Sequence, residues 1–391
     1  MIIGFDAKRA FANYTGLGNY SRYVINNLST AYPENEYRLY APKDTNNPDL
    51  ESLRSQKNIA SVFPKGINKY FSSLWRTKSI VQDLFRDNIQ LYHGLSNELP
   101  AGLDKKGIRS IVTIHDLIFL RFPDYYKAID RAVYKRKFRY ACQKADHIVT
   151  VSECTKNDVI SYFDIDPQKI SIIYQGCDTL FHHTVSNEEK QRIRKKYHLP
   201  ETFMLNVGTI ESRKNLMLAV KSLLHLDESI HLVAVGRETA YAEQIKNFVT
   251  KNKLEKRVHL FSGVPLTDLP AFYQTASVFV YPSFYEGFGI PIIEALYSGV
   301  PVIAAIGSCL LEAGGPHSIY VDPDNDEELA KNVKKILSND TFTSKMITEG
   351  KKHAIHFDDH LLADQMITLY KNVLEGRSYL TAPFEYLKSN N

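Results

Sequence analysis

The chain has 391 residues, of which 44% are hydrophobic and 24% are charged, and its formal net charge is +4. These proportions are ordinary for globular proteins, so they exclude a wholly disordered chain and a membrane-embedded bundle, and the length predicts two domains. The mild positive charge permits anionic small ligands or a membrane surface, but it does not indicate nucleic acid as a partner.

Four cysteines are scattered along the chain without CxxC spacing. We therefore expect reduced thiols in a cytoplasmic protein and no structural zinc. The opening segment MIIGFDAKRA has an apolar run that breaks at Asp6, which predicts a first strand and no signal peptide. The longest uncharged segment, residues 295–311, is interrupted by glycine and proline and is shorter than the ~20 residues of a spanning helix.

Ten apolar segments of strand length recur along the chain, separated by segments with helical period. Many are apolar at every position, as expected for strands buried on both faces of a parallel sheet. The segments are MIIGF, IQLYHG, SIVTIHD, HIVTVS, KISIIY, TFMLNVG, HLVAVGR, VHLFSG, SVFVYPS and VPVIAA. This alternation of strands and helices predicts an α/β protein. Because ten strands are more than a single sheet usually holds, we expect two Rossmann-like domains.

The domain boundary is expected where KISIIY ends and a polar stretch, residues 174–192, leads to TFMLNVGT. The first domain is then residues 1–175 and the second is residues 176–369. The segment DDHLLADQMITLYKNVLE has the period of a helix, and we expect a C-terminal helix, about residues 370–391, to pack back on the first domain.

Two loops of the first domain carry candidate site residues, because ligands of open parallel sheets bind beyond the carboxyl ends of the strands. In ANYTGLGNYSR, Gly16 and Gly18 lie between a strand and a helix, where backbone amides can approach an anion. The alternative is a simple turn. In SIVTIHDL, His115 and Asp116 follow a strand. A neutral histidine there can polarise a leaving group or donate to a hydroxyl; the alternative is a packed His115 beside a capping Asp116.

In the second domain, LNVGTIESRKN places Gly208 after a strand and two adjacent cations, Arg213 and Lys214, before a helix. Cations at a helix N-terminus oppose the helix dipole, so they require a compensating negative group. A bound diphosphate would supply that group. The alternative is that both residues are solvated surface charges.

The segment FYEGFGIPIIEALYSGVPVIA contains two carboxylates, Glu286 and Glu294, on either side of a glycine-rich turn. Gly287 and Gly289 form the turn, and Pro291 fits the first position of the following helix. Glu286 can accept hydrogen bonds from vicinal hydroxyls, and Glu294, in the first turn of the helix, can reach a second diol. Acidic residues are also ordinary in loops and first turns, but the pair around glycines is more specific than either member.

The pattern E-x7-E in EGFGIPIIE, followed by GVPVIAA, resembles that of the family 4 retaining glycosyltransferases, which have the two-domain GT-B fold. Further similar segments are TGLGNYSR, TIHDL, HIVTVSECTK, GTIESRKN, HLFSGVP and SCLLEAGG with YVDP. The resemblance covers the chain from Ile2 to about Leu374. It implies two Rossmann-like parallel-sheet domains that face an interdomain cleft, with a nucleotide-sugar donor bound to the second.

The resemblance implies a role for each candidate residue. Glu286 would bind hydroxyls of the donor sugar, and His115 would lie at the reacting centre, near the sugar's primary hydroxyl. Arg213 and Lys214 would neutralise the diphosphate, and Glu294 would hold the ribose. Backbone groups would complete the donor site. The amides of Phe288, Gly289 and Ile290 would bind the sugar, and the loop around Gly263 and Val264 would bind the base. Gly208 would line the site, and the loop of Gly16 and Gly18 would close over the diphosphate.

Thr209 departs from the pattern, because many family members carry arginine there. Which cation contacts which phosphate is therefore open. Fixed cations and helix N-termini can stabilise the leaving group without a metal. The acidic triplets DID, residues 164–166, and DPD, residues 322–324, match a metal motif of the other glycosyltransferase fold, but both lie in turn-like sequence beside proline. We therefore expect no required metal and no cofactor.

Two segments combine basic and aromatic residues: residues 121–144, and PKGINKYFSSLWRTK, which contains the one tryptophan, Trp75. Such segments can lie on anionic lipid, which would suit a lipid-linked glycan acceptor and a peripheral contact with the inner face of the membrane. The alternative is a solvated helix face whose aromatic residues pack inward. No recognised nucleic-acid-binding module accompanies them.

The resemblance thus implies a cytoplasmic, retaining transferase that moves a hexose from a nucleotide diphosphate sugar to a glycan or lipid-linked glycan. GTIESRKN and TGLGNYSR are most similar to the mannosyltransferase-like branch, so GDP-mannose is the first donor expected and a UDP-sugar such as UDP-glucose is the alternative. Two other classes stay open: a nucleotide-sugar epimerase or hydrolase, which needs no acceptor, and a non-catalytic nucleotide-sugar-binding protein. A hydrolase with two carboxylates would need both at one glycosidic bond.

Overall fold

The computed structural model describes residues 1–381 and 384–390 and divides them into two compact units. Unit 1 comprises residues 1–175 and 359–381, and unit 2 comprises residues 176–358 and 384–390. Within these residues, no helix combines the length and the apolar character that a membrane span requires.

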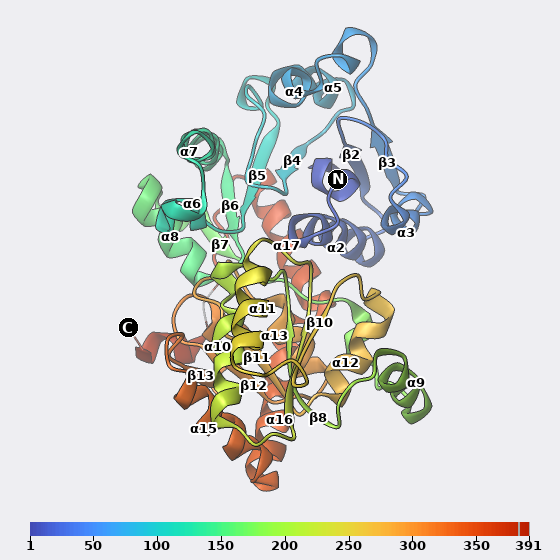
Figure 1. Ribbon diagram of the computed structural model, residues 1–391. Helices are drawn as coiled ribbons and strands as arrows, with labels where there is room; N and C mark the ends of the chain where they lie inside the picture. The colour runs from blue at the N-terminus through green and yellow to red at the C-terminus, as the bar shows by residue number, and fades with distance from the viewer. Residues whose placement is uncertain (382–383, 391) are drawn as a thin grey trace. The chain divides into compact units, whose positions relative to one another are not determined.

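Unit 1 is built on a seven-stranded parallel sheet with the order β3-β2-β1-β4-β5-β6-β7 (Figure 1). The chain winds outward in one direction from β1 and in the other from β4, so the switch point lies between these two strands. Ligands of open α/β sheets bind at such points. The strands are β1 Ile2–Asp6, β2 Glu36–Tyr40, β3 Ile59–Val62, β4 Leu91–Gly94, β5 Arg109–Ile114, β6 His147–Thr150 and β7 Ile170–Ile172.

Unit 2 is built on a six-stranded parallel sheet with the order β10-β9-β8-β11-β12-β13, and its switch point lies between β8 and β11. The strands are β8 Thr202–Val207, β9 Ile230–Val235, β10 Val258–Phe261, β11 Val278–Tyr281, β12 Val302–Ala305 and β13 Ile319–Val321. The predicted α/β class with two parallel sheets is confirmed.

Four inner strands are buried at every position, and the strands missed from sequence lie at or next to a sheet edge. All four residues of β4, β6, β11 and β12 are buried, because helices cover both faces of each sheet. The sequence analysis missed β2, β3 and β13. β3 and β13 are edge strands with partly exposed residues, and β2 alternates polar and apolar positions next to β3.

Helices connect the strands of each sheet. In unit 1 they are α1 Lys8–Ala12, α2 Gly16–Ala31, α3 Glu51–Arg54, α4 Ser72–Leu74, α5 Ile80–Arg86, α6 Ile118–Arg121, α7 Ala128–Lys144, α8 Glu153–Phe163 and α17 Asp359–Leu374. In unit 2 they are α9 Asn187–Tyr197, α10 Leu216–Ser222, α11 Tyr241–Lys251, α12 Leu269–Thr275, α13 Ile290–Tyr297, α14 Leu310–Gly314, α15 Asp326–Leu337 and α16 Asp340–Ala354.

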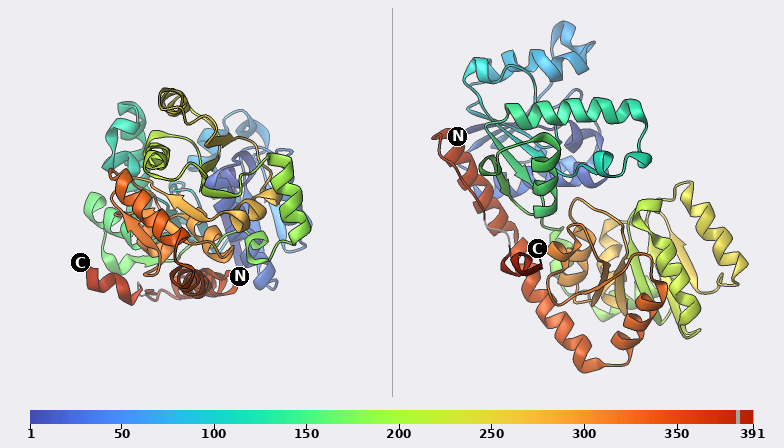
Figure 2. Two further views of the ribbon diagram at one scale, coloured as in Figure 1. Left: turned by 60° about the horizontal axis from the view of Figure 1, so that its bottom comes forward. Right: turned by 90° about the vertical axis from the view of Figure 1, so that its left-hand side faces the viewer.

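The helix α17 belongs to unit 1, where it packs beside α2 (Figures 1 and 2). The hydroxyl of Tyr23 donates to the carboxylate of Asp359 at 2.6 Å, and the amide of Asn27 donates to the carbonyl of Asp359 at 2.7 Å. Further along the helix, the Tyr370 hydroxyl lies 2.6 Å from Nδ1 of His93 on β4. Contacts with unit 1 therefore start at Asp359, so the prediction that they start near residue 370, after a second domain ending at 369, was wrong.

The segment after α17 divides between the two units, which corrects the expectation that the chain packs on the first domain up to residue 391. Residues 384–390 belong to unit 2, where the rings of Phe384 and Tyr386 lie 5.3 and 5.9 Å from the ring of His353. Aromatic contacts of this kind account for the docking of the segment on unit 2. Residues 382, 383 and 391 lie outside the described residues.

Candidate functional site

Two loops meet at the switch point of the unit 2 sheet. β8 leads to a short 3-10 turn, Ser212–Lys214, and the neighbouring strand β11 leads to the loop that carries Glu286. The amide of Phe284 donates to the carbonyl of Arg213 at 2.9 Å, so the two loops are joined by a backbone hydrogen bond. Residues far apart in sequence are thereby placed at the sheet edge where ligands of such folds bind.

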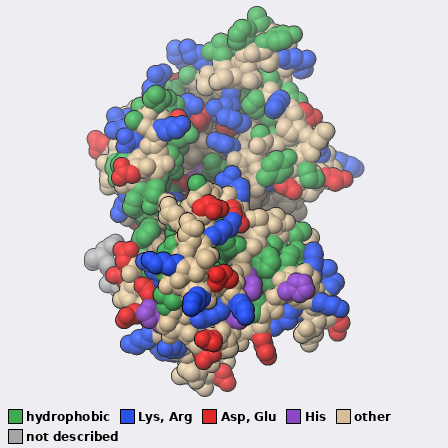
Figure 3. Space-filling view, in the orientation of Figure 1, with side chains coloured by type: hydrophobic (Ala, Val, Ile, Leu, Met, Phe, Trp, Pro, Cys, Tyr) green, Lys and Arg blue, Asp and Glu red, His purple; other side chains and the backbone are tan. Residues whose placement is uncertain are grey.

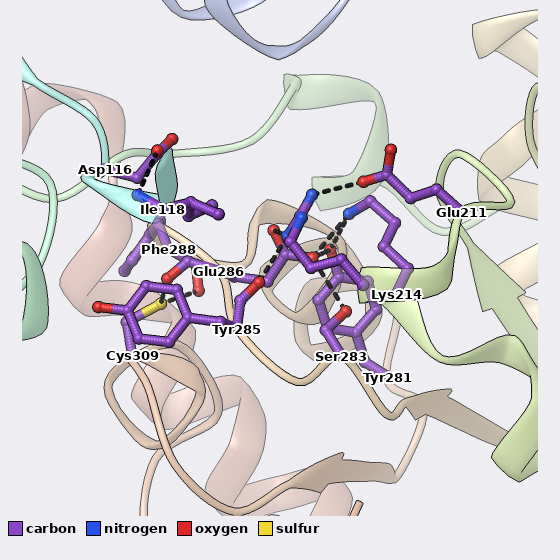
Figure 4. Close-up of polar contacts among 11 residues, drawn as sticks. Asp116, Ile118, Glu211, Lys214, Tyr281, Ser283, Tyr285, Glu286, Phe288 and Cys309 are labelled. Atoms are coloured by element: carbon purple, nitrogen blue, oxygen red, sulfur yellow. Dashed lines mark hydrogen bonds and ion pairs between the residues drawn. The ribbon is translucent and has the colours of Figure 1, made fainter. Parts of the chain in front are cut away.

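Glu286 is the centre of a charged cluster in this place (Figure 4). Its Oε2 lies 2.7 Å from Nη1 of Arg213, and its Oε1 lies 2.7 Å from Nζ of Lys214. Oε1 also accepts hydrogen bonds from the hydroxyls of Tyr281, at 3.1 Å, and Ser283, at 2.9 Å. One carboxyl oxygen therefore has three donors and the other has one.

The position of the two cations differs from the prediction. Arg213 and Lys214 occupy the 3-10 turn before α10 instead of the N-terminus of the helix itself. Their compensating negative group is Glu286, and Arg213 has a second partner in Glu211 at 2.7 Å. Both cationic side chains are only 16% exposed, so the alternative of solvated surface charges was wrong.

Burial and ion pairing act in opposite directions on the Glu286 carboxyl. Burial raises its pKa, but the charges of Lys214 and Arg213 lower the pKa to about 2, so Glu286 is ionised at neutral pH. For Lys214, burial lowers the pKa, but Tyr281 and Glu286 raise the pKa above its ordinary value. Arg213, Lys214 and Glu286 by themselves carry one positive charge in excess, and Glu211 beside Arg213 offsets it.

The glycine-rich turn after Glu286 is fixed by its backbone. Gly289 has a φ of 137°, which other residues rarely adopt, at the position where α13 begins. The thiol of Cys309 donates to the carbonyls of Glu286, at 3.2 Å, and Phe288, at 2.7 Å. The turn that leads into α13 beside the charged cluster is therefore fixed in place. It consists of Gly287, Phe288, Gly289 and Ile290.

Glu294 lies one residue further along α13 than predicted. It is the fifth residue of the helix, and Pro291 is the second, so Glu294 is outside the first turn and the helix dipole does not account for it. The hydroxyl of Tyr273 on α12 donates to Oε2 of Glu294 at 2.6 Å. Desolvation by the surrounding protein raises the pKa of Glu294 to about 7, although the hydrogen bond from Tyr273 acts in the opposite direction.

The predicted backbone positions lie along the same sheet edge. Gly208 follows β8, and a Cβ on it would lie 3.2 Å from Cδ of Lys214, so the structure brings it against the charged cluster. Gly263 and Val264 follow β10, which β9 separates from β8. The sequence analysis missed Gly236, which follows β9; a Cβ there would lie 1.8 Å from the Gly208 carbonyl oxygen.

In unit 1, His115 follows β5 and is buried. Its Nε2 lies 2.8 Å from the carbonyl oxygen of Leu95, so Nε2 carries the proton and Nδ1 is an acceptor. The amide of His115 donates to Oδ1 of Asn97 at 2.9 Å, and the ring of Tyr20 packs edge-on at 4.5 Å. Burial lowers the pKa of His115 to about 4, which keeps it neutral at pH 7. Asp116 accepts from the amide of Ile118 at 3.1 Å, as in the capping alternative.

Gly16 and Gly18 lie inside a helix, not in a loop between strand and helix, so that part of the prediction was wrong. They are the first and third residues of α2, and α1 stands between β1 and this point. A Cβ on residue 18 would lie 1.8 Å from the carbonyl oxygen of Asn13, whereas residue 16 has open space. Gly18 therefore permits a close approach of two backbone segments.

Sequence reasoning missed the residues that hold the candidate site residues in place. They are Glu211, Tyr281 and Ser283 in the charged cluster, Tyr273 beside Glu294, and Cys309 below the glycine-rich turn. Tyr281 and Ser283 stand in YPSFYEG, close to Glu286, so their place after a strand was a usable signal. Tyr273 and Cys309 come from separate elements and carried no such signal.

Both acidic triplets have local backbone roles. Oδ1 of Asp166 accepts from the amide of Gln168 at 2.9 Å, and Oδ1 of Asp322 accepts from the amide of Asp324 at 2.9 Å. Across residues 1–381 and 384–390, no group of three or more histidine, cysteine or acidic side chains is placed to hold a metal ion.

Comparison with known families identifies the chain. A family model described as "Glycosyl transferases group 1" matches residues 187–353, and one described as "Glycosyltransferase Family 4" matches residues 15–180. The chain belongs to the family 4 glycosyltransferases. The predicted resemblance to this family is therefore confirmed, and the two units are the two halves of a GT-B enzyme.

Individual relatives agree with the family. The chain is 28% identical over 373 residues to O-antigen chain mannosyltransferase B of Escherichia coli, covering 91% of this chain and 96% of that protein. It is 29% identical over 225 residues to O-antigen chain mannosyltransferase RfbU of Salmonella typhimurium, covering 58% of this chain and 60% of that one. The fold matches that of Anabaena HepE in complex with UDP, with a TM-score of 0.75, 15% identity, and coverage of 95% and 99%.

Proposed function

We propose that this family 4 glycosyltransferase is a retaining enzyme that transfers a hexose, in the first instance mannose, from a nucleotide diphosphate sugar to a glycan or lipid-linked glycan. The main support for a donor site is the cluster of Arg213, Lys214 and Glu286 at the switch point of unit 2. Two cations suit a diphosphate, and a carboxylate beside them can accept hydrogen bonds from sugar hydroxyls.

The proposed role of each residue follows from the charge that develops during the reaction. As the bond between sugar and diphosphate breaks, Arg213 and Lys214 stabilise the negative charge on the leaving group. Glu286 orients the sugar, Glu294 accepts hydrogen bonds from the ribose, and Nδ1 of His115 accepts from the sugar's primary hydroxyl. The acceptor oxygen bonds to the anomeric carbon on the face that the phosphate leaves, and the departing phosphate oxygen takes the acceptor's proton.

Two donors are candidates. Similarity to two O-antigen mannosyltransferases favours GDP-mannose. The structural match to a protein that holds UDP favours a UDP-sugar as the alternative. Base recognition through the backbone around Gly263 and Val264 would leave few side chains to separate guanine from uracil, so binding measurements have to decide.

Calorimetric binding of GDP, UDP and ADP to the wild type and to Glu294→Ala tests the donor site. One nucleotide should bind in the presence of EDTA, and Glu294→Ala should weaken it through loss of the ribose contact. Absence of binding to folded wild type would contradict the proposed donor site. Consumption of sugar nucleotide without any acceptor would favour an epimerase or hydrolase.

We also propose that transfer requires no metal ion. Arg213 and Lys214 supply two fixed positive charges where a metal would otherwise neutralise the diphosphate. Transfer rates measured with EDTA and with added Mg²⁺ should therefore agree. A strict requirement for Mg²⁺ or Mn²⁺ would contradict this.

A further part of the proposal is a peripheral contact of unit 1 with anionic lipid on the cytoplasmic side of a membrane. Of the two basic-aromatic segments, α7 packs Tyr134 and Phe138 on Phe119, with ring centres 5.7 and 5.2 Å apart, although Tyr134 stays 37% exposed. The other segment exposes apolar side chains beside lysines: Ile67, Tyr70, Phe71 and Leu74 are 73%, 86%, 57% and 53% exposed.

This second segment surrounds α4, and in Figure 3 hydrophobic and basic side chains gather over α4 and α5. Exposed apolar side chains next to cations suit the surface of an anionic bilayer. The pair Tyr70→Ser and Phe71→Ser should reduce co-sedimentation with phosphatidylglycerol vesicles. Ile355→Ser, at a site in unit 2 that is 63% exposed, is the control. Equal binding of the variant, the control and the wild type would contradict the contact.

A further inference from the structure

In the proposed donor site, the carboxylate of Glu286 pairs with two cations and also binds the sugar. Its Oε1 is saturated by Lys214, Tyr281 and Ser283, whereas the one partner of its Oε2 among the described residues is Arg213. A carboxylate offers about four lone-pair sites, so Oε2 retains capacity for a further donor such as a sugar hydroxyl. The carboxylate can therefore bind a sugar without releasing the cations.

The same carboxylate sets the charge that a ligand meets. Arg213 and Lys214 together carry two positive charges, and the ion pairs with Glu286, at 2.7 Å each, reduce this to one. Side chains that are 16% and 11% exposed are poorly screened by solvent, so this reduction is felt at close range. Glu211, by contrast, has a side chain that is 36% exposed and touches Arg213 alone of the two cations.

The sugar-nucleotide donor and the nucleoside diphosphate product differ beside Glu286 in the charge of the terminal phosphate and in the presence of sugar hydroxyls. In a nucleotide diphosphate sugar the terminal phosphate is a diester with one negative charge, and the sugar brings hydroxyl donors. In the free nucleoside diphosphate the terminal phosphate carries about −1.5 to −2 charges, because its second pKa is near 6. Compared with the donor, the product thus has more negative charge beside Glu286 and lacks the sugar hydroxyls from which Glu286 accepts hydrogen bonds.

We propose that Glu286 acts as the internal counter-ion of Arg213 and Lys214 and so weakens the binding of the nucleoside diphosphate product relative to the sugar-nucleotide donor. This specificity role rests on the proposed donor site and goes beyond contact with the sugar. Glu286 repels a terminal phosphate that has lost its sugar, and it attracts the sugar that is still attached. The expected consequence is easier release of the product after transfer.

Calorimetric titration of UDP, GDP, UDP-glucose and GDP-mannose into three proteins tests this role. Removing the charge in Glu286→Gln should tighten the nucleoside diphosphate that the wild type binds by at least about tenfold, and should not tighten the matching sugar nucleotide. Glu211→Gln removes a more exposed partner of Arg213 and should change the same affinity much less. An unchanged or weaker affinity for the diphosphate in Glu286→Gln would overturn the proposal.

A charge-balanced variant keeps the test decisive where Glu286→Gln folds poorly, because that variant removes the carboxylate partner of Lys214 and leaves Arg213 with Glu211 alone. Lys214→Gln alone should weaken the nucleoside diphosphate. Lys214→Gln combined with Glu286→Gln removes one charge of each sign, so it restores the wild-type net charge of the cluster and should bring the affinity back toward the wild-type value. A double variant as weak as Lys214→Gln would overturn the counter-ion role. Failure of the wild type to bind any of the four ligands would instead overturn the donor site itself.

Discussion

At the scale of single residues, the two carboxylates of the E-x7-E pattern are in opposite electrostatic states. Glu286 faces two cations, which hold its pKa at about 2 against the effect of burial. Glu294 faces the hydroxyl of Tyr273, and desolvation raises its pKa to about 7. One residue type therefore supplies a permanent negative charge and, eight positions later, a group that titrates near neutral pH.

Binding of the sugar nucleotide should weaken as the pH falls through the pKa of Glu294. Ribose hydroxyls donate better to a carboxylate than to a carboxyl group, so the complex favours the ionised form. Below a pKa of about 7 the empty site must release a proton on binding, and affinity should fall by up to about tenfold per pH unit. UDP-glucose and GDP-mannose are suitable ligands because their phosphate diesters do not titrate there.

Glu294→Gln provides the comparison for this pH dependence. The variant has no titrating group at the ribose, so its affinity should stay level over the same range of pH. His115 does not confuse the result, because burial lowers its pKa to about 4. Parallel slopes for the wild type and Glu294→Gln would exclude Glu294 as the titrating group.

At the scale of elements, the start of α2 depends on Gly18 and not on Gly16. A Cβ on residue 18 would lie 1.8 Å from the Asn13 carbonyl oxygen, a backbone atom that cannot move without moving its segment. Gly18→Ala should therefore lower the free energy of unfolding by about 1–3 kcal/mol. Gly16→Ala meets open space in the same helical turn and should be neutral or stabilising by about 0.5–1 kcal/mol.

Urea denaturation of the two variants beside the wild type measures this difference. Both substitutions add one methyl group two residues apart, so the comparison isolates the close approach to Asn13. Equal losses of stability would mean that the contact does not govern the start of the helix.

Elements with a strong periodic or apolar signal could be predicted from the sequence, including the edge strands β7 and β10, whereas β2, β3 and β13 could not. α17 was predicted from DDHLLADQMITLYKNVLE and spans Asp359–Leu374. β11 and β12 were predicted because burial on both faces requires apolar residues throughout. β13 has three residues at an edge, and β2, with the sequence EYRLY, alternates polar and apolar positions. The three residues of β13 are too few to show a period, whereas the alternation in β2 is the pattern of a strand with one solvated face and was a usable signal.

At the scale of the whole molecule, the structure brings Arg213, Lys214 and Glu286 together as ion pairs that no local sequence pattern predicted. Arg213 and Lys214 were expected to need a negative partner, yet Lys214 and its partner Glu286 are 72 residues apart. Their meeting depends on β8 and β11 being neighbours, a fact of sheet order that no local pattern reveals. The same holds for Cys309, whose contacts with the glycine-rich turn cross from another loop.

Unit 1 also depends on sheet and helix packing that joins the two ends of the chain, because α17 reaches β4 through Tyr370. Its hydroxyl lies 2.6 Å from Nδ1 of His93, both residues are fully buried, and burial lowers the pKa of His93 to about 3. Tyr370→Phe would leave this ring nitrogen without its partner. We expect it to lower the free energy of unfolding of unit 1 by about 1–3 kcal/mol.

Tyr32→Phe is the matched control, because the hydroxyl of Tyr32 also contacts α17, at Asp364, but on an exposed surface. Its loss should change stability by no more than about 0.5 kcal/mol. Thermal unfolding with and without the nucleotide that binds unit 2 separates the transitions, since a ligand raises the transition of the unit that holds it. Tyr370→Phe should lower the other transition. If Tyr370→Phe and Tyr32→Phe had equal effects, the buried hydrogen bond would not be what ties α17 to unit 1.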